Sequence, residues 1–429
     1  MRRKIYRDLV AWKDKSNRMP LVVNGARQVG KSYILREFGE GEFDNYIMVN
    51  LETNRELVEK FDQSIEPKPI IQYLETVYSQ RIIAGKTLIV FDEIQACEKA
   101  LTSLKYFCEQ VPEYHIIAAG SLLGVAINRQ KYSFPVGKVD ELTLYPMDFE
   151  EYLWAIGREN FATLIREHYE SNEPLDVHSM AIDFYNQYLI VGGMPAAVNE
   201  FIASGSYLAA NDIQNRILNE YIADMAKYAE PSTSIKIRSC YESIPAQLAK
   251  ENRKFQYSVV QRGGSATIFG ESIEWLKYAG VILKCQKITQ GTLPIKVYVE
   301  LSDFKLYMSD IGLLTMQSGV AAQAILSPIE SKNTYLGAIA ENYVAQAFSA
   351  NEIALLYWKN DNTAEVDFII QKGIDVIPVE VKSGLNTRSK SLNIFMKRYE
   401  CTYGIRISKK NFGFENDIKS VPLYAVFCI

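Results

Sequence analysis

A glycine-rich segment near the N-terminus has the spacing of a phosphate-binding loop. Residues 25–32 match the pattern G-x-x-x-x-G-K-[ST] at every defined position. Glycines there let successive backbone N–H groups face a phosphate; Lys31 can then reach the β- and γ-phosphates, and the Ser32 hydroxyl can ligate Mg²⁺. We predict that ATP binds through the following residues: Gly25, Ala26, Arg27, Gln28, Val29, Gly30, Lys31 and Ser32.

Two adjacent carboxylates follow an apolar run downstream of this loop. Asp92 can hold the Mg²⁺ shell, and Glu93 can orient or deprotonate the attacking water. Alone, the pair could equally be solvated acids at the end of a buried strand, but together with the loop it predicts ATP hydrolysis. Ser121 ends a later strand and would lie near the γ-phosphate if the two strands are adjacent; a simple tight turn is the alternative.

Charged residues near the C-terminus form a second candidate site. In a strand pattern, Glu365 and Asp367 would share one face of a single strand, and Glu380 and Lys382 one face of the next. Carboxylates beside a lysine can hold Mg²⁺ or Mn²⁺ for phosphodiester hydrolysis. We therefore predict Asp367, Glu380 and Lys382 as catalytic residues, together with Lys31 and Glu93 of the first site. An ordinary amphipathic strand is the alternative.

Two neighbouring features extend this second site. Glu341, on a helix predicted over 335–350, could supply a further metal ligand beside Asp367 and Glu380, just as Ser32 and Asp92 do in the first site. The run from Lys382 to Tyr399 contains no acidic residue and could neutralise a nucleic-acid backbone. Its basic residues are Arg388, Lys390, Lys397 and Arg398.

The elements that must position these residues alternate between strand-like and helix-like in the first third of the chain. Short apolar runs rich in β-branched residues are typical of parallel strands covered on both faces. They lie at 21–23, 46–50, 87–91, 115–119 and 141–144. The fold class that we predict is α/β, with a P-loop NTPase core in which a parallel sheet lies between helices.

The remaining chain changes character twice. Residues 150–232 are mostly helical, with an interruption at Gly192-Gly193-Met194-Pro195. Residues 233–318 contain helical segments followed by two strands, 281–288 and 295–301, which is the order of a winged helix. Such a unit can contact a nucleic-acid backbone or pack against protein. Its basic residues are Lys250, Arg253, Lys254 and Arg262.

Composition excludes several classes of protein. The chain has 429 residues, enough for roughly three domains. Its net charge of −4 gives no global attraction for nucleic acid, so such binding requires a local patch. Six cysteines without a C-x-x-C pair and three histidines without a spaced pair predict neither zinc nor disulfides. Since the N-terminus lacks a signal-peptide pattern and no apolar run could span a bilayer, we expect a cytoplasmic protein without a membrane partner.

Several motifs together resemble the bacterial and archaeal AAA-type ATPases that carry a C-terminal domain of unknown function. They are G-A-R-Q-V-G-K-S, L-I-V-F-D-E-I-Q, A-G-S, Y-P-M-D-F-E-E-Y-L and G-G-M-P. The resemblance implies an additional-strand P-loop fold with a helical lid, in which Gly193 and Pro195 lie near the nucleotide base. The family commonly has Gly-Arg before the fifth strand, where this chain has Gly137-Lys138. A lysine cannot copy a bidentate arginine contact. Arg129 and Lys138, past the fourth strand, could reach a neighbouring subunit's nucleotide; a solvated surface charge is the alternative for each.

At the other end, Glu341, Asp367 and Glu380-Val381-Lys382 resemble, in order, the catalytic set of the PD-(D/E)XK nuclease superfamily. This resemblance implies a restriction-endonuclease-like α/β domain and a metal-dependent deoxyribonuclease activity, although the same scaffold can serve only to bind nucleic acid. We expect a core at 1–156, a helical lid at 157–232, a winged helix at 233–318 and a nuclease-like domain at 319–429.

The functional expectation is an ATP-hydrolysing AAA-type protein that couples nucleotide turnover to DNA binding or processing. Its expected partners are ATP and DNA, with a homo-oligomer left open. The alternative is an ATP-dependent signalling or scaffolding switch whose nuclease-like domain is an inert interaction module.

Overall fold

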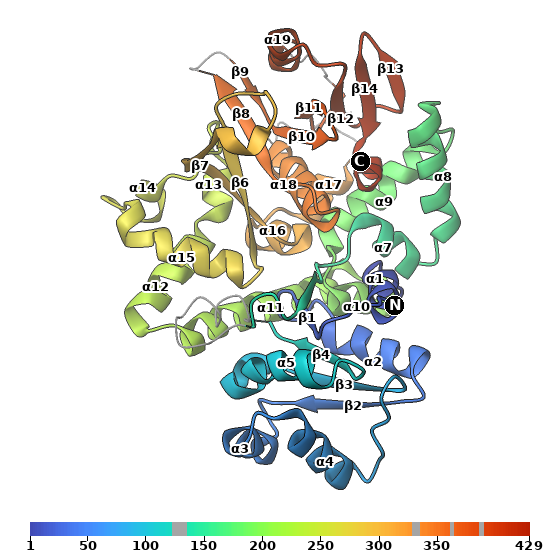
Figure 1. Ribbon diagram of the computed structural model, residues 1–429. Coiled ribbons are helices and arrows are strands. Elements are labelled where there is room, and N and C mark those ends of the chain that lie inside the picture. Colours follow the sequence, from blue (N-terminus) through green and yellow to red (C-terminus); the bar gives the residue numbers. More distant parts are fainter. Residues whose placement is uncertain (122–134, 328–334, 361–363, 386–389) are drawn as a thin grey trace. The chain divides into compact units, whose positions relative to one another are not determined.

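The computed structural model describes residues 1–121, 135–327, 335–360, 364–385 and 390–429 (Figure 1). The chain forms two compact units: unit 1 comprises 1–145 with 278–280, and unit 2 comprises 146–277 with 281–429. Arg129 and Arg388 lie outside the described residues. Within the described ranges, no helix combines the length and apolar character that a bilayer crossing requires.

Unit 1 is built on a five-stranded parallel sheet in the order β2-β3-β4-β1-β5. The five predicted strands are confirmed: β1 (Leu21–Asn24), β2 (Asn45–Asn50), β3 (Thr87–Asp92), β4 (His115–Ala119) and β5 (Asp140–Thr143). Every residue of β3 and β4 is buried, as their continuous apolar runs predict. Because β4 lies between β1 and β3, the ends of the three strands are neighbours at one edge of the sheet.

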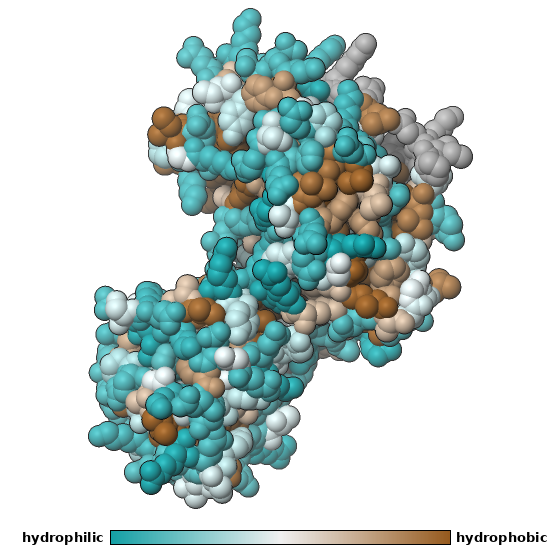
Figure 2. Space-filling view, turned by 90° about the vertical axis from the view of Figure 1, so that its right-hand side faces the viewer, coloured by the Kyte–Doolittle hydropathy of each residue, from teal (hydrophilic) through white to brown (hydrophobic). Residues whose placement is uncertain are grey.

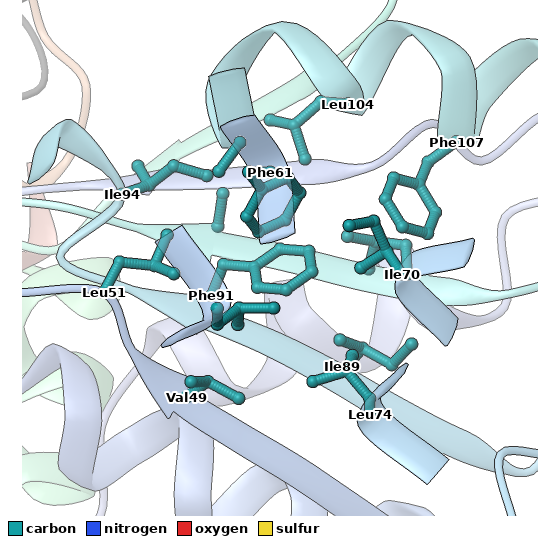
Figure 3. Packing of buried hydrophobic residues seen from close by; sticks show 14 of the residues in the cluster. Val49, Leu51, Phe61, Ile70, Leu74, Ile89, Phe91, Ile94, Leu104 and Phe107 are labelled. Carbon is teal, nitrogen blue, oxygen red and sulfur yellow. The ribbon is translucent and has the colours of Figure 1, made fainter. Parts of the chain in front are cut away.

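Helices hold this sheet in place. They are α1 (Ile5–Lys13), α2 (Lys31–Glu42), α3 (Arg55–Gln63), α4 (Pro67–Tyr78), η1 (Ile94–Ala96) and α5 (Glu98–Gln110). Apolar side chains of α3, α4 and α5 pack with those of β2 and β3 in one cluster, where Phe91 meets Phe61 and Phe107 with ring centroids 5.5 and 6.1 Å apart (Figure 3). This packing makes β3 a rigid support for Asp92 at its end.

Unit 2 begins with helices and confirms the helical expectation for 150–232. They are α7 (Phe149–Ala155), α8 (Glu159–Ser171), α9 (His178–Val191), α10 (Pro195–Ser204) and α11 (Tyr207–Tyr228). The side chain of Asp148 caps α7, and Gly192, with φ +71° and ψ −166°, ends α9 in a conformation that L-residues avoid. The predicted interruption at 192–195 is thus present.

The next segment of unit 2 contains helices followed by an antiparallel strand pair. Its elements are α12 (Pro231–Glu242), α13 (Ile244–Leu248), α14 (Tyr257–Val260), α15 (Ala266–Tyr278), β6 (Ile282–Ile288), η2 (Ile295–Tyr298), β7 (Val299–Met308), α16 (Ile311–Gln317) and α17 (Ala322–Leu326). The strand predicted at 295–301 starts late, because residues after Pro294 form a short helical turn. The strand β6 also pairs in parallel with β8 (Leu356–Asn360), so the pair belongs to the larger sheet β7-β6-β8-β9. The winged-helix assignment stays a prediction.

The C-terminal segment adds the rest of that sheet and a third sheet. The elements are α18 (Tyr335–Ala350), β9 (Ala364–Val366), β10 (Phe368–Lys372), β11 (Asp375–Val381), α19 (Lys390–Tyr399), β12 (Gly404–Ser408), β13 (Gly413–Glu415), β14 (Ile418–Pro422) and η3 (Leu423–Cys428). The predicted single strand through Glu365 and Asp367 is wrong. The strand before Asp367, β9, pairs with β8, and the strand after it, β10, pairs with β11. Asp367 therefore lies where the chain passes from one sheet to the other, and Glu365 precedes this junction.

Exposed apolar side chains come from many elements. On the face that Figure 2 shows, the hydrophobic surface forms separate patches among hydrophilic residues. The most exposed examples are Leu208, Val136, Leu301 and Ile374. Among the described residues, single exposed apolar side chains of this kind are ordinary for a folded chain.

Candidate functional site

The loop between β1 and α2 adopts a curled backbone that accommodates few side chains. Gly25, Gln28 and Gly30 have φ values of +148°, +66° and +95°. A Cβ atom added to Gly25 would lie 2.3 Å from the carbonyl oxygen of Leu144, so only glycine fits there. Gly30 is the N-cap of α2, which leaves the first N–H groups of the helix available to an anion.

The side chain of Lys31 is buried and folds back against the backbone of this loop. Its Nζ donates to the carbonyl oxygens of Gly25 and Ala26, each at 2.8 Å. Burial lowers the pKa of the Lys31 ammonium to about 8, although the carboxylates of Glu93 and Asp92 oppose the shift. Phosphate oxygens are stronger acceptors than these two carbonyls, so the arrangement suits ATP.

The metal-binding pair predicted at this site is in direct contact. The Ser32 hydroxyl donates to Asp92 Oδ2 at 2.7 Å, and the Glu93 N–H donates to Asp92 Oδ1 at 3.1 Å. Burial raises the pKa of Asp92, and the hydrogen bond from Ser32 opposes this shift. Two hard oxygens from a helix start and a strand end fit the donor set that Mg²⁺ prefers.

The third member of the site is Glu93, at φ +52°, beside the end of β4. Its Oε2 accepts from Gln95 Nε2 at 2.5 Å and from the Ser121 hydroxyl at 3.4 Å. The strand adjacency on which the expectation for Ser121 depended is therefore present. Gln95 belongs to the D-E-I-Q motif, but its sequence context did not predict a role for it.

Other basic residues of unit 1 have partners within the unit. Arg27 lies 3.7 Å from Glu52, and Lys138 lies 2.9 Å from Glu109. Sequence reasoning missed Arg3, which is buried and donates to the carbonyl oxygens of Val29 at 2.8 Å and Tyr145 at 2.6 Å. Arg3 thereby links the phosphate-binding loop to the segment after β5. In the sequence, nothing distinguishes Arg3 from the other charged residues of the N-terminal segment.

The Gly-Gly-Met-Pro segment is held by a buried carboxylate of unit 2. The Gly193 N–H donates to Asp310 Oδ2 at 2.6 Å, and the Gly193 carbonyl accepts from the Met147 N–H at 2.8 Å. Burial raises the pKa of Asp310 to about 6, although backbone N–H groups oppose the shift. Pro195 begins α10. The nucleotide contact of Gly193 and Pro195 stays a prediction.

In the C-terminal cluster, Asp367, Glu380 and Lys382 come together. Asp367 Oδ2 accepts from the Val381 N–H at 2.8 Å, and Lys382 Nζ lies 2.6 Å from Glu380 Oε1. Burial and the nearby Asp367 raise the pKa of Glu380, while Lys382 opposes the shift. Within the described residues, Glu380 Oε2 is buried without a hydrogen-bond partner. A carboxylate pair with such an orphaned oxygen fits one divalent cation.

Glu341 does not fit as a further metal ligand, because basic side chains of the protein already pair with its carboxylate. Its Oε1 accepts from Lys305 Nζ at 2.9 Å and from the Tyr307 hydroxyl at 2.5 Å, and Arg253 pairs with its Oε2. Lys305 also lies 2.7 Å from Glu365. Burial favours the neutral form of Glu365, but ion pairs with Lys305 and Lys359 outweigh it and lower its pKa to about 2. Across the described ranges, no group of three or more metal-ligating side chains is present.

Three of the basic residues in the winged-helix candidate are likewise engaged. Arg253 pairs with Glu341, Lys254 pairs with Asp303, and Lys250 donates to Gln256 at 3.0 Å. On α19, in contrast, Lys390, Lys397 and Arg398 are exposed, while Leu392 and Phe395 pack inward.

The parallel sheet with β4 between β1 and β3, the curled loop and the Asp92–Glu93 pair define a P-loop ATPase. Residues 17–153 match the family model of an AAA domain, which makes this part of the chain an AAA-type ATPase domain. Residues 182–324 and 336–426 match two domains of unknown function, DUF8612 and DUF4143. The expected C-terminal domain of unknown function is confirmed; its nuclease-like character stays a prediction.

Solved structures resemble the chain at low identity. A Walker-type ATPase of Pyrococcus abyssi is 15% identical with a TM-score of 0.46, covering 74% of this chain and 95% of its own. The Aeropyrum pernix ORC2 protein, in ADPNP and ADP complexes, is 10% identical with a TM-score of 0.35, covering 76% and 92%. No curated protein matches the chain in sequence.

Proposed function

We propose that the chain hydrolyses ATP at the loop of unit 1 and couples the nucleotide state to DNA binding or processing by the C-terminal part of unit 2. The observation that carries the first half is the 2.7 Å contact between Ser32 and Asp92, which joins the phosphate loop to the acidic end of β3. A resting hydrogen bond between these two groups is what a site built for a nucleotide-bound Mg²⁺ would keep in its absence.

In this mechanism, Lys31 exchanges its two carbonyl partners for β- and γ-phosphate oxygens, and the N–H groups at the start of α2 receive the phosphates. Ser32 and Asp92 would hold Mg²⁺, which when bound neutralises charge on the phosphates. Glu93 accepts a proton from the attacking water, and Ser121 lies beside it. Gly193 and Pro195 belong to this proposal as contacts of the base.

The DNA half of the proposal is supported by charge and by the C-terminal cluster. Lys390, Lys397 and Arg398 are exposed on α19, which contains no acidic residue, and such a face can neutralise phosphates. Asp367 and Glu380 would hold Mg²⁺ or Mn²⁺ for phosphodiester hydrolysis, and Lys382 would assist the phosphate or the water.

Incubation with single-stranded, duplex and branched DNA tests both halves. The wild type, Lys31→Ala and Asp367→Ala are compared with Mn²⁺, with and without ATP. We expect salt-dependent DNA binding that weakens when Lys390, Lys397 and Arg398 are changed to Glu. The matched control changes Lys296, Lys372 and Lys410, which are exposed elsewhere in unit 2. Cleavage that Asp367→Ala abolishes supports processing; ATPase activity indifferent to DNA, with equal loss in both triple variants, contradicts the DNA proposal.

A second candidate is favoured by the ion pairs of Glu341. Because Lys305 and Arg253 neutralise it from within the chain, the nuclease-like cluster can be an inert module of an ATP-dependent signalling or scaffolding switch. This candidate predicts no Mn²⁺ binding beyond the nucleotide site and an ATP-dependent change of assembly state, including a homo-oligomer, measured by light scattering. Mn²⁺ binding that is lost in Asp367→Ala would rule it out.

A further inference from the structure

The side chain of Gln95 lies against the carboxylate of Glu93. Gln95 Nε2 donates to Glu93 Oε2 at 2.5 Å, and the Ser121 hydroxyl reaches the same oxygen at 3.4 Å. Among the described residues, no hydrogen bond is made to the other oxygen, Glu93 Oε1. Two donors therefore converge on one oxygen of the carboxylate and leave the second available.

The backbone explains how residues two positions apart meet in this way. Glu93 is left-handed, at φ +52° and ψ +46°, a conformation that L-residues seldom adopt. The short helix η1 follows, with the Ala96 N–H donating to the Glu93 carbonyl at 2.9 Å. This tight turn folds Gln95 back toward Glu93. Gln95 Oε1 is buried and has no hydrogen-bond partner in the described part of the chain, so the hydrogen bond to Glu93 sets the orientation of the amide.

We propose that Gln95 is a positioning residue for ATP hydrolysis. Its amide fixes the Glu93 carboxylate so that Oε2 faces the protein and Oε1 accepts the proton of the attacking water. A neutral amide suits this task because it donates a hydrogen bond without the positive charge of a lysine, which would hold the carboxylate in an ion pair and weaken it as a base. The inference rests on the proposed role of Glu93.

The test compares Gln95→Ala with the control variant Gln110→Ala. Gln110 makes the same kind of contact in the same unit, because its Nε2 donates to Glu66 at 2.7 Å. Gln95→Ala is expected to lower kcat about tenfold, with KM for ATP and affinity for a non-hydrolysable ATP analogue unchanged within about twofold. Gln110→Ala should change none of these quantities.

Gln95→Met keeps the length of the side chain and removes the donor without adding a charge, so a loss of kcat at an unchanged melting temperature supports the inference even if Gln95→Ala folds poorly. Glu93→Gln separates the two proposals. If Glu93→Gln binds the analogue but hydrolyses at the wild-type rate, the role of Glu93 fails. If Glu93→Gln is inactive while both Gln95 variants retain wild-type kcat, only the inference about Gln95 is overturned. Adding Gln95→Ala to Glu93→Gln should have no further effect, and a further loss would contradict action through Glu93.

Discussion

The Ser32 hydroxyl and the Asp92 carboxylate, sixty positions apart, meet at 2.7 Å where α2 begins and β3 ends. Ser32→Ala and Asp92→Asn should each lower kcat for ATP hydrolysis by about a hundredfold and raise the Mg²⁺ concentration needed for half-maximal rate, because each removes a hard oxygen from the proposed metal shell. Steady-state assays over a Mg²⁺ series measure both effects. Ser103→Ala, a buried hydroxyl on α5, is the control. An unchanged Mg²⁺ dependence in both site variants would exclude the pair as ligands.

ATP affinity should depend on the protonation of Lys31. Its pKa of about 8 in the free protein means that the ammonium is lost as the pH rises above that value. If ATP binds only the charged form, affinity falls by up to about tenfold for each pH unit above 8. Titration with a fluorescent ATP analogue measures this dependence.

Lys31→Arg serves as the matched variant, because a guanidinium stays charged throughout this range. Its affinity should vary little with pH, whereas Lys31→Ala should bind ATP weakly at every pH. Wild-type affinity that is flat across pH 8, or strong binding by Lys31→Ala, would contradict the role of the ammonium.

Gly193 has no room for a side chain. A Cβ atom there would lie 2.0 Å from the Met147 carbonyl oxygen, so backbone atoms must move. Gly193→Ala should lower the free energy of unfolding by more than about 2 kcal/mol, measured by urea denaturation. Gly270→Ala on α15 is the control, since nothing lies within 4 Å of its added Cβ. Equal stability of the two variants would show that the segment relaxes without cost.

His115 should make unit 1 sensitive to acid. It is buried beside Trp12 and Phe43, and burial together with Arg18 lowers its pKa from 6.5 to about 4. The charge of Lys13 acts in the same direction, whereas a hydrogen bond with the Lys13 backbone and the charge of Asp14 oppose the shift. Between these values the unfolded chain binds the additional proton, so the contribution is complete above pH 6.5 and is lost as the pH falls toward 4.

The expected loss is on the order of 1 kcal/mol between about pH 7 and pH 5, measured by urea unfolding. His115→Phe should flatten this part of the profile. Ile116→Val, a buried substitution at the next position of β4 that removes no titratable group, provides the comparison and should retain the wild-type slope. An identical slope in His115→Phe would contradict the assignment.

The buried pair of Lys305 and Glu341 should behave as a coupled unit. Glu341→Gln leaves Lys305 and Arg253 with one charge fewer to pair with and should cost about 3 kcal/mol of unfolding free energy. Lys305→Met should cost a similar amount, and the double variant should cost less than the sum. Additive losses would indicate that the two groups act independently.

Local patterns predicted much of the first site. The loop at 25–32, the five strands and the acidic end of β3 depend on residues close in sequence, where glycine spacing and apolar runs are readable. Arg3 was missed because its partners, Val29 and Tyr145, are carbonyl groups, which every residue carries. Its role follows only from the position that the folded sheet gives it.

The second site was predicted less well for a related reason. Alternation around Asp367 indicates a strand but not its partners, and the chain changes sheets at that residue. We predicted Glu341 as a metal ligand because the sequence did not reveal that Lys305, on a distant strand, pairs with the Glu341 carboxylate. Helix and strand periodicity describe one element at a time, whereas charge compensation depends on how elements meet.

The strand β6 pairs with β7 on one edge and β8 on the other, and these neighbours lie in segments that match two different family models. A fragment cut between residues 324 and 336 would leave the end of β6, from Gln286 to Ile288, with unpaired backbone donors and acceptors, a surface prone to aggregation. The two segments are therefore interlocked parts of one folding unit.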